Sequence, residues 1–142
     1  MKSFRRTNEQ LYPLKRNDIV MVMSDLPNGK ALAKCMVIEE DNKYTLNQRI
    51  CCFDNYDFEP EFLCALLNRH DYFLSFNDGN GQTNLRKDDI LNCDIICPPI
   101  ELQKKYSDYV KIINELIKKQ NENYEDLNNL FKSEMHKIKE VD

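Results

Sequence analysis

A glycine-containing loop near the middle of the chain carries side chains that could bind nucleic acid. Asparagine and glutamine side chains lie before and after Gly79 and Gly81, and two cationic side chains follow this loop. Amides can form paired hydrogen bonds with adenine edges, and cations commonly bind phosphates. Two further turns have similar side chains. Together they give nine candidate nucleic-acid contacts: Lys30, Asn47, Gln48, Arg49, Asn80, Gln82, Asn84, Arg86 and Lys87.

The same composition is also typical of ordinary turns. Asn and Gly tolerate the backbone conformations that tight turns require. In this alternative, the side chains of Gln82 and Asn84 form hydrogen bonds with the backbone of their own loop and do not contact nucleic acid. Composition alone favours the alternative.

Catalytic and metal-binding signals are weak. Among six cysteines and two histidines, only Cys93 and Cys97 have the close spacing of zinc ligands, and no C-x-x-C is present. Cys64 and His70 are six residues apart, which places them on different helix faces. The Gly79–Gly81 loop lacks the Gly-Lys-Ser/Thr of a phosphate-binding loop. We therefore predict a protein with no catalytic residues, metal or cofactor of its own.

Net charge and hydropathy limit the partners and the cellular compartment that the sequence predicts. The 142 residues carry a net charge of −4, and residues 1–100 carry −3, so any nucleic-acid contact requires a local basic patch or a basic partner. Most cysteines lie among apolar residues, as buried thiols do. With neither a signal peptide nor a membrane span evident, we expect reduced thiols and a cytoplasmic location.

Hydrophobic patterning predicts an α+β domain with a small, mostly antiparallel sheet and one packed helix. Residues 1–16 form a loosely attached lead-in, and residues 17–99 form the domain. A helix should begin near Asp57–Pro60 and run to about residue 70 or on to residue 73, and 87–91 could form one helical turn. The expected strands are 18–24, 33–38, 44–46 with 49–53, and 93–97.

Residues 100–142 predict one long helix with a coiled-coil seam. This segment contains neither Pro nor Gly, and a 3-4 repeat extends over about four heptads. A partner helix or the domain itself could cover the seam; its length favours a partner. Gln120 and Glu134 are its polar members. The candidate dimerisation residues are Val110, Ile113, Ile117, Gln120, Tyr124, Leu127, Phe131 and Ile138.

Four segments, in order, resemble the specificity (S) subunit of type I restriction–modification systems. Asn17–Met21 resembles its Gly-Asp-Ile strand, and Leu46–Ile50 its "n-Q-r" segment. Gly79–Leu85 resembles its G-x-x-Q-x-N-[LI] loop, and Ile96–Gln103 its Pro-Pro stretch before the spacer helix. Asn stands at 17 where Gly is usual, and Leu stands at 102 where Glu is usual. The resemblance covers nearly all of residues 17–140.

The resemblance implies a non-catalytic subunit that reads double-stranded DNA. In that family, two recognition domains are held apart by two antiparallel spacer helices. These helices dock methyltransferase subunits, which bind S-adenosylmethionine and methylate adenine, and restriction subunits cleave. ATP and Mg²⁺ are likewise expected on partner subunits.

This chain has one domain and one helix, so it resembles a half-size or truncated specificity subunit that pairs as a homodimer. Fewer residues precede the first strand than the family usually has. The alternative hypothesis is a coiled-coil assembly or regulatory module that is descended from the family but does not read DNA. The net negative charge and the small number of residues before the first strand favour that alternative.

Overall fold

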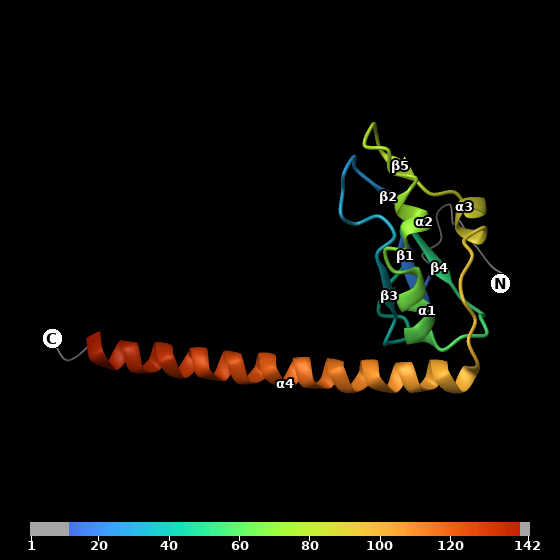
Figure 1. Cartoon of the computed structure of the whole chain (residues 1–142). Helices are drawn as coiled ribbons and strands as arrows, with labels where there is room; N and C mark the ends of the chain where they lie inside the picture. Colours follow the sequence, from blue (N-terminus) through green and yellow to red (C-terminus); the bar gives the residue numbers. More distant parts are fainter. Residues whose placement is uncertain (1–11, 140–142) are drawn as a thin grey trace. The chain divides into compact units, whose positions relative to one another are not determined.

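A computed structural model describes residues 12–139 (Figure 1). The chain divides into two units, the first ending at Ser107 and the second beginning at Asp108. The fold class is α+β, with small antiparallel sheets, short helices and a long C-terminal helix, as predicted. Its elements are β1 (Ile19–Val22), β2 (Ser24–Asp25), β3 (Cys35–Val37), β4 (Ile50–Phe53), α1 (Pro60–Leu67), α2 (Asp71–Leu74), β5 (Thr83–Asn84), α3 (Lys87–Leu91) and α4 (Ile100–Lys139).

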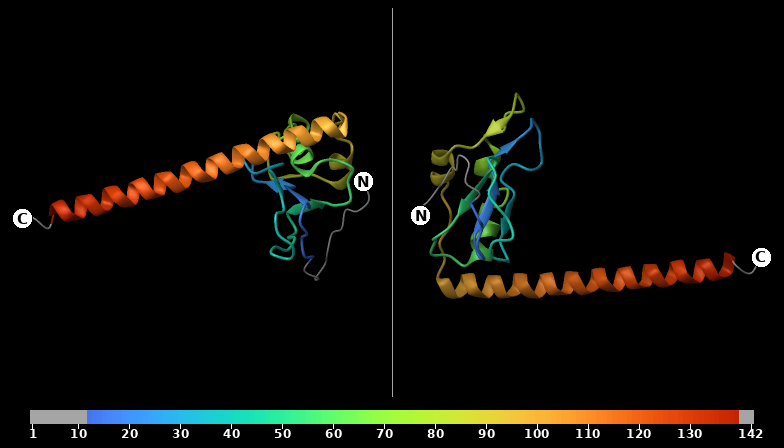
Figure 2. Two further views of the ribbon diagram at one scale, coloured as in Figure 1. Left: turned by 90° about the horizontal axis from the view of Figure 1, so that it is seen from below. Right: turned by 180° about the vertical axis from the view of Figure 1, so that it is seen from behind.

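The main sheet has the strand order β3-β1-β4, and both pairings are antiparallel. Met21 of β1 lies between Cys35 and Cys51, and Ile19 lies between Val37 and Phe53. Because side chains alternate along a strand, these residues share one face of the sheet. A second, two-stranded sheet joins β2 to β5 (Figures 1 and 2).

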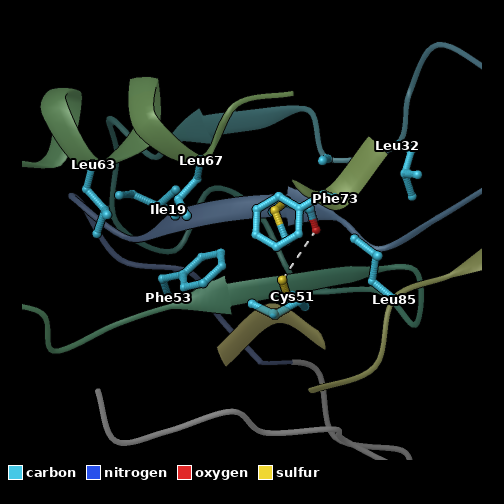
Figure 3. Packing of buried hydrophobic residues seen from close by; sticks show 11 residues of the cluster. Ile19, Leu32, Cys51, Phe53, Leu63, Leu67, Phe73 and Leu85 are labelled. Carbon is cyan, nitrogen blue, oxygen red and sulfur yellow. Dashed lines mark hydrogen bonds between the residues drawn. The ribbon is translucent and has the colours of Figure 1, made fainter. Parts of the chain in front are cut away.

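The principal core lies on the face that carries Ile19 and Met21. Leu63 and Leu67 of α1 cover this face together with Phe73 of α2, which is fully buried (Figure 3). Burying such side chains stabilises a domain by roughly 1.5–3 kcal/mol each. The opposite face has a smaller cluster of Leu14, Val20 and Ile38.

The lead-in differs from its prediction where it is described. Leu14 is buried, and Pro13 forms an isolated bridge with Thr45, so residues 12–14 are part of the fold. The backbone N–H of Leu14 also donates to the carbonyl of Tyr44 at 3.0 Å. Residues 1–11 of the predicted lead-in, and 140–142 of the predicted helix, lie outside the described residues.

The helix predicted from 57–60 onwards is interrupted. It ends at Leu67, and a separate short helix begins at Asp71. Arg69 has a left-handed backbone (φ 56°), which no α-helix accommodates. The side chain of Asn68 accepts a hydrogen bond from the backbone of Cys35 at 3.0 Å, so this break ties the helix end to β3.

Two strand predictions are also corrected. The predicted strand 33–38 is confined to Cys35–Val37, because Ala33 is left-handed (φ 56°). Residues 93–97 pair with no strand among the described residues, so the prediction of a last strand is wrong. Burial still alternates along this segment, because Ile95 packs against the core and Ile96 is exposed.

A buried polar side chain, that of Gln103, helps to attach the first turns of α4 to the domain. Gln103 is 2% exposed. Its Oε1 accepts from the backbone N–H of Glu59 at 3.0 Å, and its Nε2 donates to the carbonyl of Pro98 at 2.8 Å. Gln103 therefore links the chain just before α1 to the Pro-Pro stretch that precedes α4.

We expect Gln103→Ala to lower the free energy of unfolding by about 1–3 kcal/mol, because it removes two hydrogen bonds and leaves a partly buried donor and a partly buried acceptor without partners. Urea unfolding followed by tyrosine fluorescence would measure the change. Lys104→Ala, at an exposed position in the same turn, is the control. Equal stability of the two variants would show that the Gln103 hydrogen bonds contribute nothing.

Candidate functional site

Three segments that are distant in sequence meet at Met23. The N–H of Met23 donates to the carbonyl of Arg49 at 2.8 Å, and its carbonyl accepts from the N–H of Leu85 at 2.8 Å. Next to it, Ser24 pairs with Asn84 in the two-stranded sheet. The backbone therefore brings the predicted 47–49 turn and the glycine loop to one place.

A groove of about 510 Å³ opens where these segments meet. Its lining comprises three cations, three amides, one hydroxyl and two apolar side chains. These residues are Met23, Ser24, Gln48, Arg49, Gln82, Asn84, Leu85, Arg86 and Lys87. No carboxylate lines it, although the domain as a whole is acidic. The groove is thus a local basic and amide-rich surface of the kind that phosphate and base-edge contacts require.

Six of the nine candidate contacts line the groove: Gln48, Arg49, Gln82, Asn84, Arg86 and Lys87. Three do not. Asn47 instead holds its turn, because its Oδ1 accepts from the N–H of Arg49 at 2.8 Å. Asn80 lies in a turn where Asp78 accepts its backbone N–H at 2.9 Å, and Lys30 belongs to the loop after β2.

Asp25 organises the loop that contains Lys30. Its carboxylate accepts hydrogen bonds from the backbone N–H groups of Leu26, Ala31 and Leu32 at 2.8, 2.7 and 3.1 Å. These bonds, that from Ala31 foremost, lower the pKa of Asp25 below its ordinary value and keep it ionised. A side chain at Gly29 would begin 2.1 Å from this carboxylate, so the turn requires glycine.

The loop after β2 also meets the glycine loop. Gly79 has φ +77°, and a Cβ there would lie 3.3 Å from Oδ1 of Asn28. The tips of the two loops are therefore in contact above the β2–β5 pair, as Figure 1 shows. Lys30 follows Asn28 by two residues in this loop, but it does not line the groove.

Comparison with known proteins identifies the family of the chain. Residues 8–129 match the family described as the type I restriction modification DNA specificity domain. The chain belongs to this family. No curated protein and no solved structure matches the chain. The family is a non-catalytic recognition domain, which supports a DNA-recognition role for the chain.

In the specificity domain, the amides of the groove contact each other. Nε2 of Gln82 lies 3.4 Å from Oδ1 of Asn84, and Nδ2 of Asn84 lies 3.5 Å from the carbonyl of Gln82. Within-loop bonding of this kind is what the turn alternative predicts. However, hydrogen bonds of this length are weak, and both residues are exposed. A base edge could replace these bonds at little cost.

Arg86 and Lys87 are held at the beginning of α3. The backbone N–H of Arg86 donates to Oδ2 of Asp89 at 2.6 Å, which fixes the first turn of that helix. The Asp89 carboxylate therefore accepts a hydrogen bond from the backbone of Arg86, and the exposed side chain of Arg86 lines the groove. Leu85 anchors the same segment, because it is buried in the core.

The cysteines and histidines of the specificity domain provide no activated nucleophile within residues 12–139. Sγ of Cys93 lies 3.8 Å from Nδ1 of His70, but that nitrogen already accepts from the N–H of Tyr72 at 3.2 Å. Burial and the nearby Asp94 raise the pKa of the Cys93 thiol. Burial likewise raises the pKa of Cys51 to about 12 and that of Cys64 to about 11. These thiols therefore remain protonated and unreactive at neutral pH.

Within the same residues, no cluster of three or more histidine, cysteine or acidic side chains could bind a metal ion. All six cysteines are unpaired thiols. No described helix combines the length and hydrophobicity that membrane crossing demands.

The candidate dimerisation residues lie on α4. Val110 is partly exposed, and the other seven are exposed in the single chain. Apolar members such as Leu127 and Ile138 are 67% and 65% exposed. Further exposed apolar residues flank the seam: Tyr109, Ile112, Leu116, Leu130 and Met135.

Sequence reasoning missed three residues of the groove. The sequence pattern predicts Met23 and Ser24 as part of a strand, and Leu85 appears only as the last residue of the Gly79–Leu85 motif. The available signal was the position of Ser24, a polar residue directly after an apolar run. The pairing of Ser24 with Asn84 depends on a contact between residues 60 positions apart, which local patterns do not show.

Proposed function

We propose that this chain is the sequence-reading subunit of a type I restriction–modification complex, half-size or truncated, and that it works as a dimer. The observation that carries the proposal is the groove at Met23. Six exposed amide and cationic side chains converge there on a scaffold from the DNA specificity domain family.

The charge distribution supports a complex in which different subunits supply different DNA contacts. The three cations of the groove can hold only a short stretch of DNA backbone, and the rest of the domain is acidic. We infer that methyltransferase subunits supply most of the remaining phosphate contacts. Those subunits would dock on α4, bind S-adenosylmethionine and methylate adenine. Restriction subunits, with ATP and Mg²⁺, would cleave.

The amides provide the test. With a cognate methyltransferase present, we expect Gln82→Ala/Asn84→Ala to relax base preference at the target by about tenfold or more, since a bidentate contact contributes roughly 1–3 kcal/mol of discrimination. Sequencing of methylated sites from a randomised duplex library would measure it. Asn129→Ala, an amide removed from the exposed part of α4, is the control.

The net charge of −3 over residues 1–100 favours a second candidate, a coiled-coil assembly module that does not read DNA. Unchanged site preference in the Gln82→Ala/Asn84→Ala complex, with the methyltransferase still bound, would contradict DNA reading through the groove. That result would support the assembly module.

A further inference from the structure

Two Asn-Gly pairs occupy loops of the specificity domain. Asn28-Gly29 lies in the loop after β2, and Asn80-Gly81 lies in the loop between α2 and β5, which projects from one end of the first unit (Figure 1). In such a pair, the backbone nitrogen of glycine can attack the side-chain carbonyl carbon of asparagine, because glycine has no side chain to obstruct the approach. The two pairs are identical, so the fold around each pair decides how readily it reacts.

The first pair is held in place. The N–H of Gly29 donates to the carbonyl of Leu26 at 2.9 Å, which engages the hydrogen that the reaction must remove. Gly29 is also enclosed, since a Cβ there would lie 2.1 Å from the carboxylate of Asp25. The Asn28 side chain packs against the glycine loop, with its Oδ1 3.3 Å from the position of a Cβ on Gly79. Attack within this pair would break these contacts.

The second pair lacks these restraints. Within residues 12–139, neither the N–H of Gly81 nor the side chain of Asn80 has a hydrogen-bond partner. A Cβ built on Gly81 would meet none of the described residues within 4 Å, and both members of the pair are exposed. Gly81 also has φ +148°, which L side chains rarely adopt, so the loop requires glycine at the attacking position.

We propose that Asn80 is a site of spontaneous deamidation in the folded protein. The main-chain nitrogen of Gly81 loses its proton and bonds to Cγ of Asn80, while the bond from Cγ to the amide nitrogen breaks and ammonia leaves with that proton. One water molecule then opens the cyclic succinimide at either of its carbonyls and gives aspartate or isoaspartate. Water is consumed and ammonia is released, and no atom changes its oxidation state.

The product alters the surface beside the groove. Aspartate at position 80 adds a negative charge two residues before Gln82, whose side chain lines the groove. Isoaspartate also inserts one carbon into the main chain of the loop. At about 10 Å from a phosphate, one such charge weakens binding about twofold. This consequence rests on the proposed function, whereas the deamidation does not.

Peptide mapping of the full-length chain, aged in neutral buffer, tests the site. Trypsin places the two pairs in separate peptides, 17–30 and 70–86, and fragment spectra locate each amide that has become an acid. We expect Asn80 to convert at least about fivefold faster than Asn28, because the hydrogen bond of Gly29 raises the barrier at the first pair. In concentrated urea the two rates should become equal, which is the control.

Three results would overturn the site. The first is conversion of Asn28 as fast as that of Asn80 in the folded chain. The second is an Asn80 that converts in urea but keeps its amide in the folded chain. The third is aspartate at position 80 without isoaspartate, which would exclude the succinimide and therefore the attack by Gly81.

DNA affinity tests the consequence. Anion exchange separates the converted chain, which carries one more negative charge, and each fraction is then combined with a cognate methyltransferase. The converted fraction should bind duplex DNA about twofold more weakly. Asn80→Gln should lose no affinity on ageing, because glutamine would have to close a larger ring.

The two measurements fail separately. Equal affinity of the converted and unconverted fractions would overturn the effect on the groove. If neither fraction bound DNA, the proposed function would fail, and the peptide map would still decide whether Asn80 deamidates.

Discussion

Replacing Arg49, Arg86 and Lys87 together with alanine should reduce the affinity of the complex for duplex DNA on the order of 100-fold near 0.1 M salt. Each cation that contacts a phosphate releases a counterion, so the slope of log K against log salt should become shallower by about 0.9 per cation, or about 2.7 in all. The three side chains are exposed and line one groove, so their removal should leave the core intact.

Anisotropy titrations of a labelled duplex at several salt concentrations would measure both quantities. A variant that loses three cations outside the groove, Lys15→Ala/Arg16→Ala/Lys34→Ala, has the same net charge and is the matched control. If both variants lost affinity equally, the effect would come from total charge, and the groove would not be the DNA contact.

Leu127→Asp should raise the dissociation constant of the proposed α4 dimer on the order of 1,000-fold. The substitution acts on both copies, and each loses the burial of a leucine, which contributes roughly 1.5–3 kcal/mol. It also places a carboxylate in the seam. Most helical stability in proteins comes from packing of an amphipathic face rather than from intrinsic propensity, so the monomer should also have less helix at 222 nm.

Sedimentation velocity over a range of concentrations would measure the dimer constant. Asn129→Asp adds the same charge to the opposite face of the helix and should leave the constant nearly unchanged. Dimers that persist in Leu127→Asp would show that the predicted seam is not the interface. Dimers lost equally in both variants would point to the charge alone.

The fold was predictable from sequence where local chemistry decides the structure. The apolar run at Ile19–Val22 forms the central strand, and the Pro-Pro stretch precedes the long helix as expected. The prediction failed where a single backbone angle decides it. Left-handed Ala33 and Arg69 shorten a strand and end a helix, although neither residue type favours that conformation.

The residue types of the candidate site were predictable from sequence, but the point in the fold where they meet was not. Composition identified Gln82, Asn84, Arg86 and Lys87 in and after the glycine loop, and Gln48 and Arg49 in a second turn, as candidates. Their convergence depends on the hydrogen bonds of the Met23 backbone to Arg49 and Leu85. Bonds between main-chain atoms carry no side-chain signature, so the sequence did not reveal that these turns meet.

The attachment at Met23 also has a consequence for how this protein can change over generations. The walls of the groove are joined through main-chain atoms, and Leu85 is anchored in the core, whereas the six polar side chains are exposed. Substitutions at those six positions change the surface of the groove without removing any of these main-chain bonds between its walls. Under the proposed function, new target preferences can therefore arise from a few codon changes on an unaltered scaffold.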